Sequence, residues 1–306
     1  MLVDQETRGK VERVSTSSGG VLLGLLAVTC FSLTLPATRV AVPELGATTV
    51  GLGRAVIAGV LAAIVLAIRR EKLPQRRHWF SLAIVALGVI IGFPLCTSLA
   101  MRHLPASHGA VLVGLMPAAT AVMAVLRAHE RPAKIFWFGV FGGVVAVLIF
   151  AAVEGAGAPQ PADALLLAAV VLGGLGYAEG GRLSREIGGW RVICWALTLS
   201  APILLVPVVL AWRPDSLHAS GTAWLGLAYV SIISMFLAFF AWYAALARGG
   251  VARIGQLQLI QPVLTLGWSA LFLEEPIPAG TIAAALLVIA MAALATTLGR
   301  RQAAPH

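Results

Sequence analysis

The sequence predicts an all-α membrane protein in which ten transmembrane helices form two inverted five-helix repeats. Three observations carry this prediction: the composition, a series of long apolar stretches, and a pattern that occurs twice. Of the 306 residues, 59% are apolar and only 11% are charged, whereas globular proteins average about 25% charged residues. So few charges cannot cover a surface that faces only water, so part of the surface must face lipid.

Long apolar stretches define the expected helices, because a bilayer core about 30 Å thick needs about 20 helical residues to cross it. In the first half the helices are expected at 20–40, 48–68, 79–100, 107–126 and 135–153. In the second half they are expected at 162–183, 191–211, 222–246, 254–273 and 279–298. Prolines inside these stretches are tolerated because neighbouring helices can satisfy the backbone groups that they free.

The same stretches divide the chain into four expected parts. These are an N-terminal tail 1–19, a first repeat 20–153, a second repeat 154–298 and a C-terminal tail 299–306. The N-terminal tail is polar, with no apolar core before Val21, and therefore does not resemble a signal peptide.

Lysine and arginine residues predict the orientation. With a cytoplasmic N-terminus, the inside connectors and tails hold 18 of the 22 basic residues and the outside connectors hold three, Arg39, Arg102 and Arg213. Cytoplasmic loops carry the excess of basic residues in membrane proteins. Both termini are therefore expected in the cytoplasm, in a plasma membrane of the bacterial inner-membrane type.

One sequence motif occurs twice in the chain. In GLMPAATAVMAVLRAHERP and LIQPVLTLGWSALFLEEP, one constant shift aligns Pro117 with Pro262 and Glu130 with Glu275. Because each half has five spans, the second half enters the membrane with opposite polarity. Inverted repeats are typical of secondary transporters, in which the two halves exchange conformations around a central site. Coincidence is the alternative, since an apolar helix followed by glutamate is common.

These motifs resemble the EamA repeat of the drug/metabolite transporter superfamily, with a proline inside a spanning helix, then ERP or EEP, then a glycine-rich helix. The motif occurs as Pro117, Glu130-Arg131-Pro132 and Gly139, and again as Pro262, Glu274-Glu275-Pro276 and Gly280. The run GLGRAVIAG is similar to a family segment with an early arginine, here Arg54. The resemblance covers about residues 20–298 and implies a ten-helix exporter of small metabolites, often amino acids or related amines. The second repeat departs from it, because Arg191 is the only early arginine of its seventh span.

Ionisable residues within spans are costly in lipid and are therefore candidates for function. Glu179, in GLGYAEGGRLSRE, is expected to bind a substrate ammonium or to carry a coupling proton. The alternative is a structural pair with Arg182, three residues later on the same helix. Arg54 suits a substrate carboxylate because its planar guanidinium binds two oxygens at once. The alternative, which is the favoured interpretation, is a structural role in which Arg54 snorkels to the outer headgroups or caps carbonyls of a neighbouring helix.

The ninth span predicts a polar face. Four polar or amphipathic residues step by three, four and three and therefore share one side of a helix: Gln258, Gln261, Thr265 and Trp268. This face is expected either to wall a cavity for a polar or zwitterionic solute or to hydrogen-bond to other helices. The matching face of the fourth span is apolar, with Val113, Met116 and Thr120, so an asymmetric pocket is expected.

Several further side chains have two open interpretations. Tyr177 is a candidate for the cavity wall. Trp242 and Tyr243 are also candidates for the cavity wall, although their position near a helix end favours the aromatic belt at the membrane surface. His103 and His108 flank the connector between the third and fourth spans, where a solvated loop histidine is favoured over a proton relay.

Other function classes fit the sequence less well. Intramembrane enzymes need clustered catalytic groups, and the chain has neither HExxH nor GxSxG. The three cysteines have no ligand spacing, and no cofactor, metal or nucleic-acid partner is predicted. The sequence therefore predicts a secondary exporter of amino acids or amine-bearing analogues, with protons as the candidate coupling ion. Exporters of drugs or nucleosides, and a non-transporting lipid-handling or scaffold protein, are the alternatives.

Overall fold

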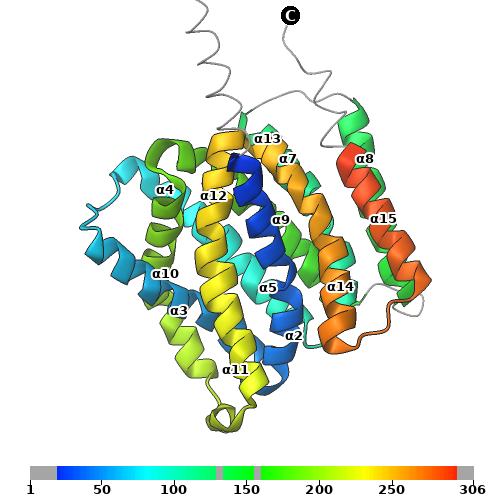
Figure 1. The fold of residues 1–306 in the computed structure, drawn as a ribbon, viewed down its shortest axis with the longest axis horizontal. Coiled ribbons are helices and arrows are strands. Elements are labelled where there is room, and N and C mark those ends of the chain that lie inside the picture. Colours follow the sequence, from blue (N-terminus) through cyan, green and yellow to red (C-terminus); the bar gives the residue numbers. More distant parts are fainter. Residues whose placement is uncertain (1–18, 129–133, 155–159, 295–306) are drawn as a thin grey trace, which may run out of the picture.

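A computed structural model describes residues 19–128, 134–154 and 160–294, which form a bundle of helices (Figure 1). The first helix runs from Gly19 to Leu45, and its second part, Thr34–Leu45, is α2. We name the two ends of the bundle after it: the Gly19 face, where it begins, and the Leu45 face, where it ends. Figure 1 has the Gly19 face at the top and the Leu45 face at the bottom.

The first half continues with seven helical elements in chain order. They are α3 (Ala47–Ile68), α4 (Arg76–Val85), the π-helical segment η1 (Ala86–Gly92), α5 (Phe93–Ala100), α6 (Ala106–Val113), α7 (Met116–Ala128) and α8 (Lys134–Glu154). The elements α4, η1 and α5 form one continuous helix from Arg76 to Ala100. Likewise, α6 and α7 form one helix with an irregular turn at Gly114.

The second half has a similar order. It contains α9 (Pro161–Ile187), α10 (Gly189–Ala211), a 3₁₀ turn η2 (Pro214–His218), α11 (Gly221–Ala228), the π-helical segment η3 (Tyr229–Leu237), α12 (Ala238–Gly249), α13 (Val251–Gly255), the 3₁₀ segment η4 (Gln256–Ile260), α14 (Gln261–Leu273) and α15 (Ala279–Ala293). Within the described residues, helical segments thus lie in each expected range, the last of them as far as residue 294.

Seven of the described helices are long and apolar enough to cross a membrane: Gly19–Leu45, Ala47–Ile68, Arg76–Ala100, Ala106–Leu126, Pro161–Ile187, Gly189–Ala211 and Gly221–Gly249. Two shorter apolar helices span Lys134–Phe150 and Ala279–Ala293. The all-α membrane class is therefore confirmed, while ten crossings in two inverted repeats remain a prediction.

Element boundaries in the two halves follow the spacing of the doubled motif. Five pairs of elements begin 145 residues apart: α4 and α11 (Arg76, Gly221), α5 and α12 (Phe93, Ala238), α6 and α13 (Ala106, Val251), α7 and α14 (Met116, Gln261), and α8 and α15 (Lys134, Ala279). Pro117 and Pro262 are each the second residue of the helix that follows an irregular turn. Of the two aligned glutamates, Glu130 lies outside the described residues.

Glycines let helices approach backbone to backbone at the centre of the bundle. A Cβ atom on Gly88 of η1 would lie 2.7 Å from the Cα atom of Gly176 on α9. Two residues earlier on α9, a Cβ atom on Gly174 would lie 2.9 Å from the backbone nitrogen of Thr120 on α7. The glycine-rich sequence GLGYAEGG therefore places α9 in the middle of the bundle, against both neighbours.

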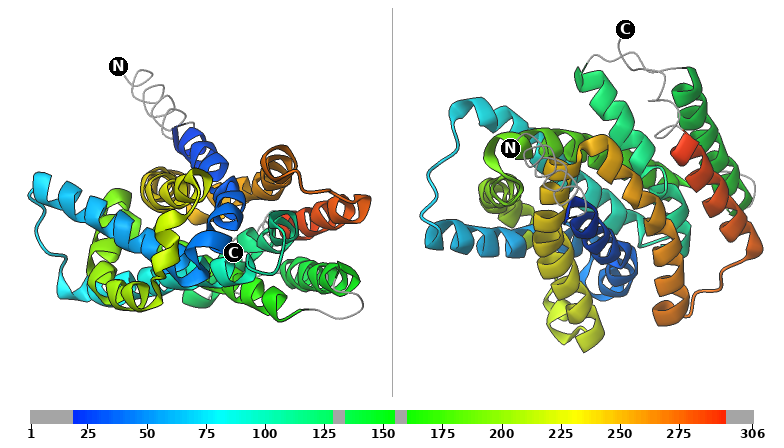
Figure 2. Two further views of the ribbon diagram at one scale, coloured as in Figure 1. Left: turned by 90° about the horizontal axis from the view of Figure 1, so that it is seen from below. Right: turned by 45° about the horizontal axis from the view of Figure 1, so that its top comes forward.

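The remaining helices enclose this centre. The helix α3 packs along α10 at one edge, and α8 packs along α15 at the other. Figure 2 shows these two pairs at opposite sides of the bundle. Between these two edge pairs, the middle of the bundle is surrounded by the first helix, α5, α7, α9, α12 and α14.

Candidate functional site

A small cavity lies in the middle of the bundle, lined by residues from both halves of the chain. Its apolar wall includes Leu35, Val89, Phe93, Met116 and Met235, and its polar wall includes Thr34, Arg54, Tyr177, Ser234 and Gln261. The centre of a water-sized sphere can move through only about 20 Å³ of it, close to the minimum that holds one water molecule. A metabolite therefore needs the walls to move apart.

Arg54 brings a buried guanidinium to this cavity. On α3, a Cβ atom on Gly51 would lie 3.1 Å from the backbone of Pro94 and Leu95, so α3 approaches α5 closely. Arg54, less than one turn later, donates from Nη2 to Thr97 Oγ1 at 3.4 Å. The residue is only 1% exposed, so Arg54 does not snorkel to the headgroups, which was one of its two structural interpretations. Helix packing holds it inside the bundle.

Arg54 has few partners for a buried cation. The Thr97 hydroxyl donates to Phe93 O at 2.7 Å, and it is the acceptor for the guanidinium. The Nε atom of Arg54 has no hydrogen-bond partner among the described residues. No carboxylate of those residues forms an ion pair with Arg54 either. Because an unpaired buried charge is strongly destabilised, this guanidinium is suited to receive an anion.

Hydroxyl and amide groups form the opposite wall. Thr34 Oγ1 and Ser234 Oγ lie 2.7 Å apart and join the first helix to η3. Gln261 lines the cavity from the start of α14. Gln258 is buried and faces the Tyr177 hydroxyl, yet neither of its amide atoms has well-formed hydrogen-bond geometry with another described residue. The first two positions of the predicted polar face thus lie at or beside the cavity.

The other two positions of that face bind another helix instead. Thr265 Oγ1 donates to Ser32 O at 2.8 Å, and Trp268 Nε1 donates to Ser32 Oγ at 2.9 Å. These bonds hold α14 against the first helix. The polar face of the ninth span is therefore divided: Gln261 lines the cavity at its N-terminal end, and Thr265 and Trp268 bind the first helix further on.

An aromatic cluster closes the cavity toward the Gly19 face. Phe31 lies 5.1 Å from Phe239 and 6.2 Å from Tyr177 between ring centroids, and Tyr177 lies 5.3 Å from Trp242. Phe239 also contacts the ring of Tyr243 at 5.4 Å. Trp242 and Tyr243 are completely buried, so the expectation that they join an interfacial belt is wrong. Both face inward because α12 packs against α9 and α10 on that side.

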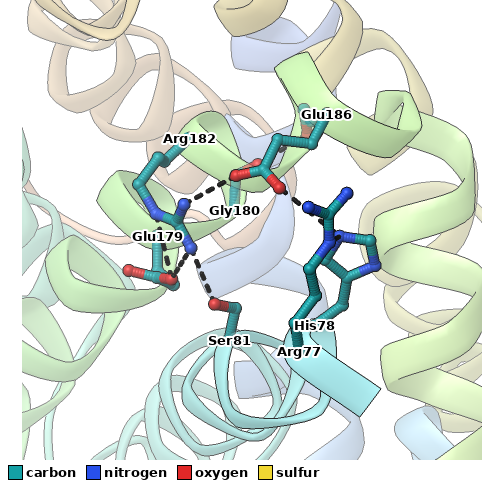
Figure 3. A network of polar contacts seen from close by, with 8 residues as sticks. Arg77, His78, Ser81, Glu179, Gly180, Arg182 and Glu186 are labelled. Atoms are coloured by element: carbon teal, nitrogen blue, oxygen red, sulfur yellow. Dashed lines mark hydrogen bonds and ion pairs between the residues drawn. The ribbon is translucent and has the colours of Figure 1, made fainter. Parts of the chain in front are cut away.

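Glu179 belongs to a polar network nearer the Gly19 face (Figure 3). Its carboxylate is 1% exposed and accepts from Arg182 Nη2 at 2.7 Å. Arg182 also donates to Ser81 Oγ on α4 and to Glu186 Oε1, each at 2.7 Å. His78 Nε2 lies 3.4 Å from Glu186 Oε2. Glu179 therefore makes the pair with Arg182 that was its structural alternative, and it is not among the residues that line the cavity.

A second contact at the Gly19 face joins the connector that follows α3 to the start of α10. Glu71 accepts from Arg191 Nη2 at 2.8 Å and from Nε at 2.9 Å, a two-pronged pair. Hydrogen bonding to this guanidinium lowers the pKa of the Glu71 carboxyl. Arg191, the early arginine of the second half, therefore lies in a different environment from Arg54.

The Leu45 face contains residues whose roles the sequence analysis did not identify. His108 is 5% exposed, and its Nε2 lies 2.6 Å from Asp163 Oδ1. The favoured interpretation of His108 as a solvated loop residue is therefore wrong, because α6 begins at Ala106 and carries His108 into the bundle. Glu275 accepts from the backbone nitrogens of Ala106 and Ser107 at 2.9 and 2.8 Å.

Other missed residues are the cavity-lining hydroxyls Thr34 and Ser234 and the rings Phe31 and Phe239. Isolated serine, threonine and phenylalanine residues are common in apolar helices, so no sequence signal distinguishes these four. Their position in the helices becomes informative only when the first helix and the eighth expected span are known to be neighbours.

Comparison with known proteins places this architecture in a family. The sequence profile of the EamA-like transporter family matches twice, over residues 18–152 and 160–297. An uncharacterized transporter of Bacillus subtilis, YdeK, is 45% identical over 283 residues, which cover 92% of this chain and 98% of that protein.

Two more distant relatives have names that include a solute. A probable terminal-alkyne amino-acid exporter of Streptantibioticus cattleyicolor is 26% identical over 92% of this chain and 95% of its own length. The aromatic amino acid exporter YddG of Ancylobacter novellus is 25% identical over 93% of this chain and 99% of its own length.

A solved crystal structure shares the fold, with a TM-score of 0.65 and 18% identity over 94% of this chain and 99% of that one. The resemblance seen in the sequence motifs is thus confirmed over both halves of the chain. The chain belongs to the EamA-like transporter family and is a multi-pass integral membrane transporter rather than an enzyme.

Proposed function

We propose that this chain is a secondary exporter of small metabolites, with amino acids or amine-bearing analogues as its leading substrates. The single observation that carries the proposal is Arg54, a fully buried guanidinium that lines the central cavity without a carboxylate partner among the described residues. The carboxylate of an amino acid supplies the missing counter-ion, in the two-oxygen geometry that arginine favours.

The other walls suit the rest of an amino acid. The Thr34 and Ser234 hydroxyls and the Gln261 amide offer oxygen acceptors to an ammonium group. The faces of Phe31, Tyr177 and Phe239 attract the same cation.

An apolar side chain finds its place on the other side of the cavity, which methionine, valine, leucine and phenylalanine residues line. Relatives that are named as amino-acid exporters add independent, though distant, support. Together these walls favour a zwitterion with an apolar side chain over a simple amine, which the charge of Arg54 repels.

Alternating access between two inverted repeats is the proposed mechanism. It is supported by the paired element starts and by the directions of the paired helices. The end of α10 lies beside the start of α3, while α4 begins beside the end of α9, where Ser81 meets Arg182. The element paired with α4, α11, begins at the Leu45 face, where its N-cap residue Ser220 donates to Glu44 at 2.6 Å.

We propose ten crossings, with the Gly19 face and both termini on the cytoplasmic side of a bacterial inner membrane, because basic residues concentrate in the connectors at that face.

The proposed substrate site consists of Arg54, Tyr177 and Gln261 with Gln258 beside them, while Thr265 and Trp268 position α14. Glu179 acts on the path from the Gly19 face, where its network ties α4 to α9. Opening toward that face separates the aromatic cluster and loosens this network. We therefore expect Glu179→Gln and Gln258→Ala to slow flux while membrane insertion stays intact.

Counterflow in proteoliposomes tests the proposal. Vesicles loaded with one unlabelled L-amino acid are diluted into the same labelled compound at equal pH, across a panel of amino acids. Saturable counterflow, fastest for apolar side chains, is the expected result. Counterflow only of nucleosides or drugs supports the alternative exporter classes. No saturable flux of any solute supports a lipid-handling or scaffold protein and refutes the proposal.

A further inference from the structure

A buried histidine and a buried aspartate meet at the Leu45 face, away from the central cavity. His108 lies on α6 and Asp163 in the first turn of α9, with 2.6 Å between His108 Nε2 and Asp163 Oδ1. The residues are 5% and 2% exposed. The other oxygen of Asp163 accepts from the backbone nitrogen of Gln160 at 2.7 Å, so the carboxylate is held in place at the helix N-terminus, where an anion is favoured.

The surroundings of this pair contain few other charges. The ring of Phe150 on α8 covers His108 at 4.9 Å between centroids. From the connector between α14 and α15, Glu275 faces the start of α6 and is engaged by two backbone N–H groups. On α2, Arg39 donates to Met101 O at 2.6 Å, whereas the sequences of α14 and α15 contain no titratable residue. Glu154 is the last residue of α8.

A single proton changes the character of this contact. A neutral imidazole makes a hydrogen bond to the carboxylate, and one added proton converts the contact into an imidazolium–carboxylate ion pair. Histidine is the side chain that ordinarily changes its charge between pH 5 and 8. The other charged groups near the transport path differ, because Arg54 and Arg182 are arginines that keep their protons, and Glu179 is paired with Arg182.

The pair also joins the two helices that form one wall of the central cavity. The helix of α6 and α7 contributes Met116 to the lining, and α9 contributes Gly173 and Tyr177. A Cβ atom on Gly173 would lie 2.8 Å from Met116 Cε, so the two helices touch at the cavity itself. A change in the strength of the His108–Asp163 contact therefore acts on the spacing of this wall.

We propose that the His108–Asp163 pair is the proton-binding site that couples solute export to a proton gradient. The proposal rests on the proposed exporter function, and it assigns the coupling ion to a site separate from the solute. Binding of one proton from the Leu45 face tightens α6 against α9. Release of that proton to the Gly19 face, once the cavity has reopened there, completes the exchange of one proton for one solute.

Two assays on the same proteoliposomes separate this inference from the exporter function. Counterflow of labelled L-phenylalanine at equal pH needs no net proton movement, whereas accumulation driven by an imposed pH gradient does. With one proton exchanged per solute, each pH unit gives about tenfold accumulation. We expect wild-type protein to show both activities and His108→Gln to keep measurable counterflow while its accumulation ratio falls to about one. Glutamine retains an Nε2 donor but cannot take up the proton.

His103→Gln is the matched control, because His103 is exposed in the connector five residues earlier, and it should accumulate L-phenylalanine like wild type. Asp163→Asn provides a second test if His108→Gln fails to melt cooperatively. A pH-sensitive dye inside wild-type vesicles should also report proton movement that accompanies L-phenylalanine. Gradient-driven accumulation by His108→Gln, counterflow without accumulation in wild type, or loss of counterflow in the folded variant each overturns the coupling site. Absence of counterflow in wild type overturns the exporter function as well.

Discussion

Replacing Arg54 with glutamine is expected to weaken the binding of solutes that carry a carboxylate and to spare solutes that do not. The guanidinium is fully buried, and its hydrogen bond to the described residues is one 3.4 Å contact with the Thr97 hydroxyl, so most of its hydrogen-bonding capacity is open to a solute. Hydrogen bonds to charged groups contribute about 1.5–3 kcal/mol. Since 1.4 kcal/mol corresponds to a factor of ten, the half-saturation concentration for L-phenylalanine should rise about 10- to 150-fold.

The assay compares two solutes that differ only in the carboxylate. Concentration-dependent counterflow is measured with labelled L-phenylalanine and with labelled L-phenylalaninamide, which retains the ammonium and the ring. For the amide, Arg54→Gln should change the half-saturation concentration by less than about threefold, because no charge-assisted bond is lost. Arg102→Gln, which removes an exposed arginine at the Leu45 face, is the control and should leave both solutes unchanged.

Thermal stability of the purified variant distinguishes a substrate ligand from a structural cation. An uncompensated buried charge carries a desolvation penalty of several kcal/mol, so the neutral glutamine should melt at the same temperature as wild type or higher. An equal rise in the half-saturation concentrations of L-phenylalanine and L-phenylalaninamide, together with a lower melting temperature, would refute the reasoning and make Arg54 a structural residue.

Three further changes test the fold. Glu71→Gln should lower the melting temperature slightly at pH 7, since exposed ion pairs contribute under about 1 kcal/mol. The pKa of Glu71 is lowered in the folded state, so this difference should disappear as the pH falls below the ordinary value of 4.5. Gly176→Ala should cost about 1–3 kcal/mol because its Cβ would meet the backbone of another helix, whereas Gly267→Ala, with open space around it, should be neutral or stabilising in a melting assay. Glu275→Gln should destabilise the protein by about 1–2 kcal/mol through loss of charge on the α6 cap, and unchanged melting relative to Glu274→Gln would contradict that role.

Periodic and compositional features explain why the helices were predictable. Apolar length, connector charges and the doubled proline motif are properties of local sequence, and lipid enforces them because each span must satisfy its own backbone. The expected ranges 48–68 and 191–211 accordingly match α3 and α10 within two residues at each end.

The candidate site was predicted only in part. Arg54, Tyr177 and Gln261 were identified as polar or aromatic groups inside apolar helices, and all three line the cavity. Glu179 was identified by the same signal but lies in an ion-pair network outside it. The free-energy cost of a charged side chain within the membrane indicates that the charge needs a partner. It does not indicate whether that partner is a solute or a neighbouring arginine.

The sequence alone determined that this protein is a helical membrane protein, where its helices lie, and its resemblance to the EamA repeat, because hydrophobic length and motif spacing act along the chain. Tertiary structure decided which side chains meet. It left Arg54 without an acidic partner among the described residues, brought His108 to Asp163 across 55 residues and buried Trp242 and Tyr243. These outcomes depend on which helices touch and how they are rotated, and glycine contacts such as Gly88 with Gly176 set that packing between residues far apart in the chain.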